Sequence, residues 1–300
     1  MTSFMNRLEY QLMQICRRNH DGSFATQSNR REMLSLFSRE LREIGYKVNN
    51  LKPHDLKGRH VNTLIKKWQV EGKSTGTIKN RVAVLRWLFE KIGKPEVVKG
   101  NAIYGIENRH YVTNKNKSIS LNDLDLSKID PFIAQSLRLQ ESFGLRREEA
   151  MKFQAVFALD GQTIENVKYI RLKSSWTKGG RARTIPIFSE KQRQELRNAV
   201  ALAGTGSLIP PQKTYKAHLS NFEAVTHQLG VGRTHGLRHN YAQERYFSLM
   251  NFQCPSVGGY RELSMQEKVQ DKVVRMQISQ ELGHSRLNIT SIYLGSWSKK

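Results

Sequence analysis

The sequence predicts a mainly α-helical protein of two domains, with a small antiparallel β-sheet in the C-terminal domain. Apolar residues recur at helical spacing through the first hundred residues. In the second half, short runs rich in β-branched and aromatic residues flank a Gly179-Gly180 turn, which predicts a hairpin. Three hundred residues, of which 38% are hydrophobic, are enough for two packed cores of ordinary size.

Four apolar stripes predict a helical domain over residues 1–98. The first three consist of Phe4, Leu8, Leu12 and Ile15, then Met33, Phe37, Leu41 and Ile44, then Val61, Leu64, Ile65 and Trp68. Ser74 can cap a fourth helix, which ends near Gly93 and Pro95 and carries Ile78, Val82, Leu85, Leu88, Phe89 and Ile92. We interpret the stripes as core. The opposite faces carry basic candidates for DNA contacts, which could also be merely solvated: Lys66, Lys67, Lys79, Arg81 and Arg86.

Periodicity disappears in a stretch dense in Asn, Lys and Gly, which predicts a linker over residues 99–118 and a second domain over 119–300. We expect helices at Pro131–Phe143 and Arg147–Phe153, then strands at Ala155–Leu159, Tyr169–Ser175 and Arg183–Phe188. Ser189 can cap a further helix that ends near Gly204, and the remainder up to Tyr293 reads as mainly helical.

The charge balance indicates a polyanionic partner. The chain has 49 basic and 26 acidic side chains, a net charge of +23. Residues 1–116 hold 22 basic and 10 acidic side chains, and the rest hold 27 and 16, so both halves are basic. Nucleic acid is the simplest partner for such a surface. A basic membrane-surface protein is the competing interpretation, but the sequence shows neither a basic amphipathic helix nor a lipidation signal.

The sequence indicates an intracellular location. It contains no apolar run near 18 residues and no charged-then-apolar leader, so we expect a cytoplasmic protein that does not enter a membrane. Cys16 and Cys254 are the only cysteines and lie far apart, which supports neither a disulfide framework nor a zinc site.

Two motifs in the middle of the chain place basic side chains at turns. A Phe-Gly-Leu sequence directly precedes Arg146, and Glu149 follows three residues later, where a helical Arg and Glu share a face. A Lys-Gly-Gly sequence places Lys178 at the tip of the predicted hairpin, where few side chains would block the approach of a phosphate. Each motif alone is a weak signal in a protein with 49 basic side chains.

Two further motifs follow. His-Gly-Leu-Arg-His places His235 and Arg238 on one face, if helical, within reach of the same phosphate. Leu-Gly-His-Ser places His284 nine residues before Tyr293. Asn288 can cap the next helix, which would put Tyr293 early in that helix. Taken alone, such a tyrosine reads as half-buried core.

Together the four motifs resemble the tyrosine recombinases, which include phage integrases, Xer-type resolvases and mobile-element integrases. They occur in the family's order across residues 141–293. The resemblance implies a helical core-binding domain followed by an α+β catalytic domain. It implies double-stranded DNA as the substrate, a homotetramer on paired sites, DNA-bending accessory proteins and no cofactor. It makes Arg146 and Arg238 the paired arginines and Lys178 the hairpin lysine. It makes His235 and His284 the pocket histidines and Tyr293 the nucleophile.

The residue types suit this chemistry. Removing the proton from a free phenol at pH 7 costs about 4 kcal/mol, and His235 is the candidate general base. Two permanently charged guanidiniums can stabilise a pentavalent phosphorane. The resemblance implies that Lys178 protonates the departing 5′ oxygen and that His284 hydrogen-bonds the phosphate. A phosphotyrosine conserves the bond energy, so no ATP is needed, and the arginines supply the positive charge that a metal would. The lack of an evident carboxylate cluster argues against a two-metal nuclease or transposase.

The chain departs from compact relatives in two places. His235 and His284 are 49 residues apart, which predicts an insertion around residues 250–270. The insertion could contact DNA, contact a neighbouring subunit, or have no role. Seven residues follow Tyr293, so we expect a short C-terminal tail or none and do not predict cyclic assembly by tail exchange. We also expect no added arm-binding domain before Phe4, which favours a simple recombination site.

Three classes of function therefore remain: a site-specific recombinase, a relaxing enzyme like the type IB topoisomerases, and a non-catalytic DNA-binding regulator with the same fold. The first needs specific paired sites, and the second would relax any supercoiled plasmid as a monomer. The third would bind DNA without using Tyr293. The residue types favour catalysis, and the domain layout and resemblance favour the recombinase.

Overall fold

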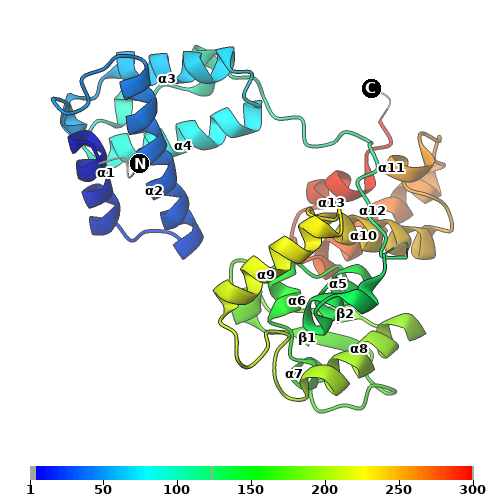
Figure 1. Cartoon of the computed structure of the whole chain (residues 1–300). Coiled ribbons are helices and arrows are strands. Elements are labelled where there is room, and N and C mark those ends of the chain that lie inside the picture. The colour runs from blue at the N-terminus through cyan, green and yellow to red at the C-terminus, as the bar shows by residue number, and fades with distance from the viewer. Residues whose placement is uncertain (1–4, 123, 299–300) are drawn as a thin grey trace. The chain divides into compact units, whose positions relative to one another are not determined.

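A computed structural model describes residues 5–122 and 124–298 of the chain (Figure 1). The chain forms two compact units, Met1–His110 and Tyr111–Lys300. Each unit has its own hydrophobic core. Phe4, which belongs to the first predicted stripe, lies outside the described residues.

Over residues 5–110, the described part of the first unit, there are four α-helices, as the stripes predict. They are α1 (Arg7–Arg18), α2 (Phe24–Glu43), α3 (Gly58–Val70) and α4 (Thr75–Lys91), with 3-10 turns η1 (Pro53–Asp55), η2 (Pro95–Val97) and η3 (Asn101–Tyr104). Side-chain oxygens of Asn6, Ser23 and Ser74 cap α1, α2 and α4 by accepting backbone N–H bonds. The apolar stripe predicts that Ile44 belongs to the core, and this prediction was wrong. Ile44 is the C-cap of α2 and is 37% exposed.

The first core extends past residue 98. Val98 and Ile106 are buried among the helices, and the Arg109 guanidinium donates to the Gly76 carbonyl. The segment after α4 is therefore held by apolar contacts and hydrogen bonds up to this point.

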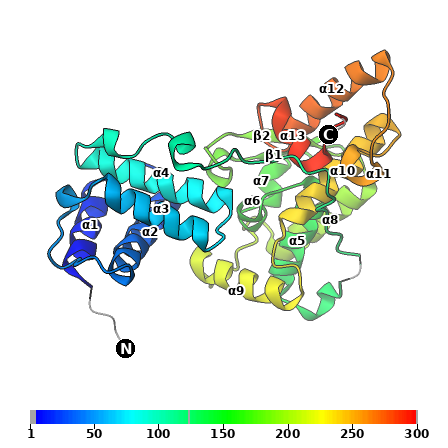
Figure 2. The same ribbon diagram turned by 90° about the horizontal axis from the view of Figure 1, so that it is seen from above.

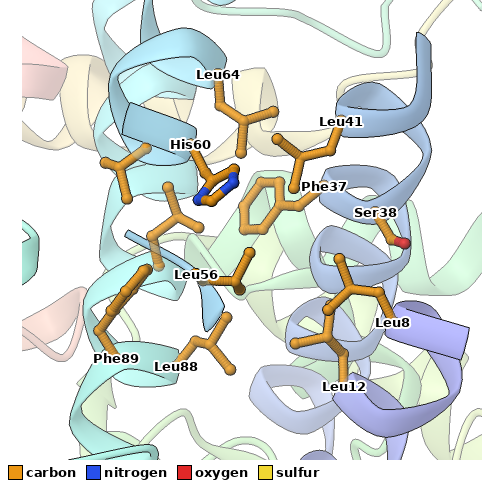
Figure 3. A pocket seen from close by; sticks show the side chains of 12 residues that line it. Leu8, Leu12, Phe37, Ser38, Leu41, Leu56, His60, Leu64, Leu88 and Phe89 are labelled. Atoms are coloured by element: carbon orange, nitrogen blue, oxygen red, sulfur yellow. The ribbon is translucent and has the colours of Figure 1, made fainter. Parts of the chain in front are cut away.

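The centre of the first unit is too tightly packed to bind a ligand. Apolar side chains surround His60, whose Nδ1 accepts a bond from the Lys57 amide (Figure 3). Burial, followed by the charges of Arg59 and Lys57, lowers the pKa of His60, so the ring is neutral at pH 7. The cavity beside it measures about 10 Å³, room for about one water molecule. We therefore treat this cavity as a packing defect.

The second unit is built around the central helix α10 (His235–Met250). α10 packs against α5 (Pro131–Phe143), α12 (Met265–Glu281) and α13 (Leu287–Leu294) (Figures 1 and 2). The remaining elements are η4 (Leu126–Lys128), α6 (Arg147–Met151), α7 (Ala155–Ala158), η5 (Ser174–Trp176), α8 (Glu190–Ala203), α9 (Tyr215–Gln228) and α11 (Pro255–Gly258). Ser189 caps α8, as predicted.

Among the residues that the structure describes, the sheet is one antiparallel pair, β1 (Tyr169–Leu172) and β2 (Arg183–Pro186), with Ile170 opposite Ile185. The prediction of a strand at 155–159 was wrong, because Ala155–Ala158 forms the helix α7. A short apolar run fits a strand or a buried helix equally well, and alanine favours the helix. No helix among the described residues is long and apolar enough to cross a membrane.

The predicted insertion between α10 and α12 contains the single turn α11. The Pro255 and Ser256 residues of this turn are buried. Gly295, just after α13, lies against them, because a Cβ on Gly295 would be 2.9 Å from the Ser256 nitrogen. The start of the insertion therefore packs against the end of α13.

Candidate active site

The structure brings together two of the predicted motifs, His-Gly-Leu-Arg-His and Leu-Gly-His-Ser with its tyrosine, at the hydroxyl of Tyr293. Tyr293 belongs to α13 and is 4% exposed. Arg238 Nε donates to its hydroxyl oxygen at 3.2 Å. The Nε2 atoms of His235 and His284 lie 3.4 and 3.5 Å from the same oxygen. A proton acceptor, a hydrogen-bond donor and a cation thus surround one phenol.

Helix α10 supplies two of these groups. It begins at His235, so His235 and Arg238 lie about one turn apart on one face, as the spacing predicts. Gly236 allows the segment before η4 to pass close by, because a Cβ there would be 2.5 Å from the Ile119 side chain. The Ile119 amide donates to the Gly236 carbonyl at 3.1 Å. This contact fixes the first turn of α10, which carries His235.

Arg238 is 1% exposed and is held by backbone oxygens. Its two terminal nitrogens donate to the carbonyls of Gly144 and Leu282, and one also approaches His284 Nε2 at 3.4 Å. Burial lowers the pKa of Arg238 to about 10, so the guanidinium remains charged at pH 7. Gly144 ends α5 with a φ of +60°, and a Cβ there would be 2.6 Å from the Tyr241 ring. A glycine at position 144 is therefore required by the backbone conformation and by the nearby Tyr241 ring, and its carbonyl supports Arg238.

Arg146 is held by the buried carboxylate of Glu149. Glu149 Oε1 accepts from Arg146 Nη1 at 2.7 Å, and Oε2 accepts from the Arg146 amide at 2.8 Å. Arg183 on β2 donates to both carboxylate oxygens, at 2.9 and 2.7 Å. Burial alone would raise the pKa of Glu149, but the hydrogen bonds and charge of Arg183, with Arg238 and Arg146, lower it to about 2. Glu149 is thus the anion that organises the arginines.

The histidines beside Tyr293 are neutral at pH 7. Desolvation, followed by the charges of Arg238 and Arg146, lowers the pKa of both His235 and His284 to about 4. His235 remains exposed on one side, whereas His284 is intermediate. A neutral imidazole can accept a proton, which the role of general base requires.

Lys178 does not join this cluster in the structure. It lies in the exposed turn between η5 and β2, where Gly179 and Gly180 adopt φ values of +79° and +67°. Lys178 forms no hydrogen bond or ion pair with any described residue. Its ammonium group is therefore accessible to a bound ligand.

The basic candidates of the first unit differ from one another. Lys66 is exposed and unpaired among the described residues, whereas Lys67 is ion-paired with Glu71. Arg81 pairs with the buried Glu40 at 3.2 Å. Lys79 and Arg86 contact the segment after α4. Lys79 donates to the Asn108 side chain, and Arg86 donates to the Asn101 side chain and the Lys99 carbonyl.

Two details of the helix that carries Tyr293 differ from the prediction. Arg286, not Asn288, is the N-cap, and Tyr293 lies one residue before the end of α13 instead of near its start. The hydroxyl of Thr290 donates back to the Leu287 carbonyl. The helix thus starts without a side-chain cap, so the residue preference of N-caps did not locate its first turn.

Sequence reasoning missed two residues of the site. His239 packs its ring 4.7 Å from the Tyr293 ring, centroid to centroid, and burial lowers its pKa to about 4. Arg183 makes the bidentate contact to Glu149 described above. Both lie in segments that the motifs drew attention to. Only the folded chain shows that they reach the site.

A family model described as the N-terminal part of phage integrases matches residues 5–98, and one described as integrase matches residues 112–244. A search of curated proteins gives no match. The second family match ends before His284 and Tyr293, so the placement of these two residues rests on the geometry above.

Among solved structures, the XerH site-specific recombinase bound to a palindromic difH substrate is 20% identical, with a TM-score of 0.56. The match covers 95% of this chain and 80% of that one. The Tn1549 transposon integrase in complex with circular intermediate DNA is 13% identical, with a TM-score of 0.55, covering 97% and 96%. These structures share the fold, and the two family matches cover most of each unit. The chain therefore belongs to the phage integrase family, that is, to the tyrosine recombinases.

Proposed function

We propose that the protein cleaves and rejoins DNA at specific sites through a 3′-phosphotyrosyl intermediate on Tyr293. The observation that carries the proposal is the position of the Tyr293 hydroxyl, within 3.5 Å of Arg238, His235 and His284. Three side chains from two motifs converge on a single oxygen, and one of them is a buried cation. A tyrosine that served only for packing would need no such neighbours.

The proposed reaction is an in-line displacement at phosphorus. The Tyr293 oxygen forms a bond to phosphorus as the bond to the 5′ oxygen breaks, and His235 takes the phenolic proton. Arg146 and Arg238 stabilise the charge on the non-bridging oxygens. His284 hydrogen-bonds the phosphate, and Lys178 protonates the departing oxygen. Attack by the freed 5′ hydroxyl reverses the sequence and rejoins the strand, so neither ATP nor a metal ion is required.

Double-stranded DNA is the proposed substrate, and a homotetramer on paired sites is the proposed assembly, aided by DNA-bending proteins. The net charge of +23 favours a polyanion. The related structures named above are complexes with DNA, which supports the same substrate class for this chain.

The test is covalent trapping on DNA flanking the protein's own gene, in EDTA, followed by quenching in SDS. Wild type and Tyr293→Phe are compared, with Tyr169→Phe as the matched control, because Tyr169 is 55% exposed on β1 and far from Tyr293 in sequence. We expect an SDS-stable adduct with wild type and the control, and none with Tyr293→Phe. Specific binding of wild type to a nicked site without adduct would overturn the catalytic proposal and favour a regulator.

Two further measurements refine the proposal. Relaxation of any supercoiled plasmid by the monomer would favour a topoisomerase-like activity over recombination. A substrate with sulfur at the bridging 5′ position tests the role of Lys178, because a thiolate leaves without being protonated. We expect Lys178→Ala to be slow on normal DNA and close to wild type on the sulfur substrate. Equal slowing on both substrates would assign Lys178 a different role.

A further inference from the structure

The C-terminal end of the nucleophile's helix is held by side chains from three separate segments. The carbonyl oxygen of Tyr293 accepts hydrogen bonds from Gln243 Nε2 on α10 and from Ser256 Oγ on α11, each at 3.2 Å. Gln243 and Ser256 are 5% and 8% exposed, so these bonds are shielded from water. The last carbonyls of a helix have no partner within the helix, and here two side chains supply one.

Gln243 also connects the helix end to the segment that precedes Ser118. Its Nε2 lies 3.1 Å from Asn116 Oδ1 and 3.3 Å from Ser256 Oγ. The Gln243 amide nitrogen thus has two N–H donors and lies within hydrogen-bond distance of three oxygens. Replacing it therefore affects the contacts of both neighbouring segments with α13.

Asn114 holds the residue that follows this helix. Its Nδ2 donates to the Ser296 carbonyl at 2.9 Å, and its Oδ1 accepts from the Ser296 amide at 2.8 Å. Gly295, which lies between the end of α13 and Ser296, has a φ of +78°, and a Cβ there would be 2.8 Å from Asn114 Oδ1. A glycine is therefore needed for the two segments to approach this closely.

We propose that these four side chains, Asn114, Asn116, Gln243 and Ser256, form a clasp that positions Tyr293 for attack. None of them reaches the hydroxyl, so they are positioning residues. Tyr293 is next to last in α13, a helix of 8 residues, so a shift of the helix end moves the phenol relative to Arg238. A misplacement of about 1 Å at a reacting atom can slow a reaction by about 100-fold. The proposal also gives a role to the insertion, which supplies Ser256.

The inference rests on the proposed phosphotyrosyl chemistry and is tested on the full chain with a nicked suicide substrate. Single-turnover cleavage at saturating DNA is measured for Gln243→Met and Ser256→Ala, together with DNA affinity and thermal unfolding. Ser248→Ala is the matched control, because that hydroxyl on α10 donates to the Arg245 carbonyl, away from Tyr293. We expect the two clasp variants to cleave about 10- to 100-fold more slowly with DNA affinity unchanged, and the control to match wild type.

Further variants separate positioning from simple loss of stability. Ser256→Thr keeps a hydroxyl and should recover much of the rate lost in Ser256→Ala. Asn114 is exposed with a φ of +49°, which suits glycine, so Asn114→Gly should fold and still cleave slowly. Asn114→Asp keeps the acceptor for the Ser296 amide and should be less affected. The slowing should persist with the 5′-sulfur substrate, because it arises at the nucleophile and not at the leaving group.

The outcomes distinguish the two proposals. If wild type forms no adduct on a site that it binds, the proposed function fails and the clasp fails with it. If wild type forms the adduct and the clasp variants cleave at the wild-type rate, the clasp alone is refuted. Slowing that disappears with the 5′-sulfur substrate, or that follows weaker DNA binding, also refutes positioning of the nucleophile.

Discussion

Replacement of Glu149 by glutamine should destabilise the protein in a way that depends on pH. Glu149 is fully buried and binds Arg146 and Arg183, and its pKa is lowered from 4.5 to about 2. At about 1.4 kcal/mol per pKa unit, the favoured charged form contributes about 3 kcal/mol of stability at pH 7. Glu149→Gln removes this charge and leaves the 8% exposed Arg183 side chain without an anion. We therefore expect a loss of about 3 kcal/mol at pH 7.

The sign of the pH effect follows from the direction of the shift. Because the pKa of Glu149 is lower in the folded state, its contribution is complete above the unfolded value of 4.5 and is lost as pH falls toward 2. By about pH 3.5, about 1 kcal/mol of the difference between wild type and variant should be gone.

The assay is urea unfolding, followed by circular dichroism, of wild type and variant at both pH values. Glu148→Gln is the matched control, because the neighbouring Glu148 side chain is 52% exposed and pairs only with Lys152. The control should change stability by less than about 1 kcal/mol at either pH. A Glu149→Gln loss that is the same at both pH values would refute the argument, since it would then not come from the charged carboxylate.

Three further predictions concern single positions. Gly144→Ala should cost about 1 to 3 kcal/mol, because φ is +60° and the new methyl would meet the Tyr241 ring; an unchanged thermal midpoint would contradict this. Lys66→Ala should reduce the slope of log affinity against log salt by about 0.9, because its exposed charge is available to a phosphate; an unchanged slope in binding titrations would exclude that contact. Arg81→Met should instead lower stability by about 3 to 5 kcal/mol, because the buried Glu40 loses its cation; a loss under about 1 kcal/mol in urea would refute this.

The sequence predicted the overall fold, because short-range patterns carry it, whereas the meeting of distant motifs in one pocket was implied by the family resemblance. Spacing alone placed His235 and Arg238 on one helix face, and the structure brings them to Tyr293. The fold class is confirmed, including the small antiparallel sheet. The roles assigned to these residues remain predictions for the trapping assay.

Contacts between distant segments could not be predicted. Arg183 reaches Glu149 across 34 residues, and nothing in the local sequence around Arg183 distinguishes it from other surface arginines. The strand predicted at 155–159 was wrong for a related reason. A run of five apolar residues is too short to show whether its periodicity is that of a helix or of a strand. The basic face of the first unit was also predicted by charge alone, which cannot tell a solvated Lys66 from a half-buried, paired Arg81.

The clasp also has a consequence for local motion. The bonds between Asn114 and Ser296 join segments 182 residues apart in sequence, yet breaking them exposes little apolar surface, since both residues are polar and Asn114 is exposed. The free energy of this local opening should therefore be far below that of global unfolding. In native-state hydrogen exchange, the Ser296 amide should exchange at a rate nearly independent of urea, whereas amides in the middle of α10 should exchange only on global unfolding. The contact between Asn114 and Ser296 can then open and close many times while the domain stays folded.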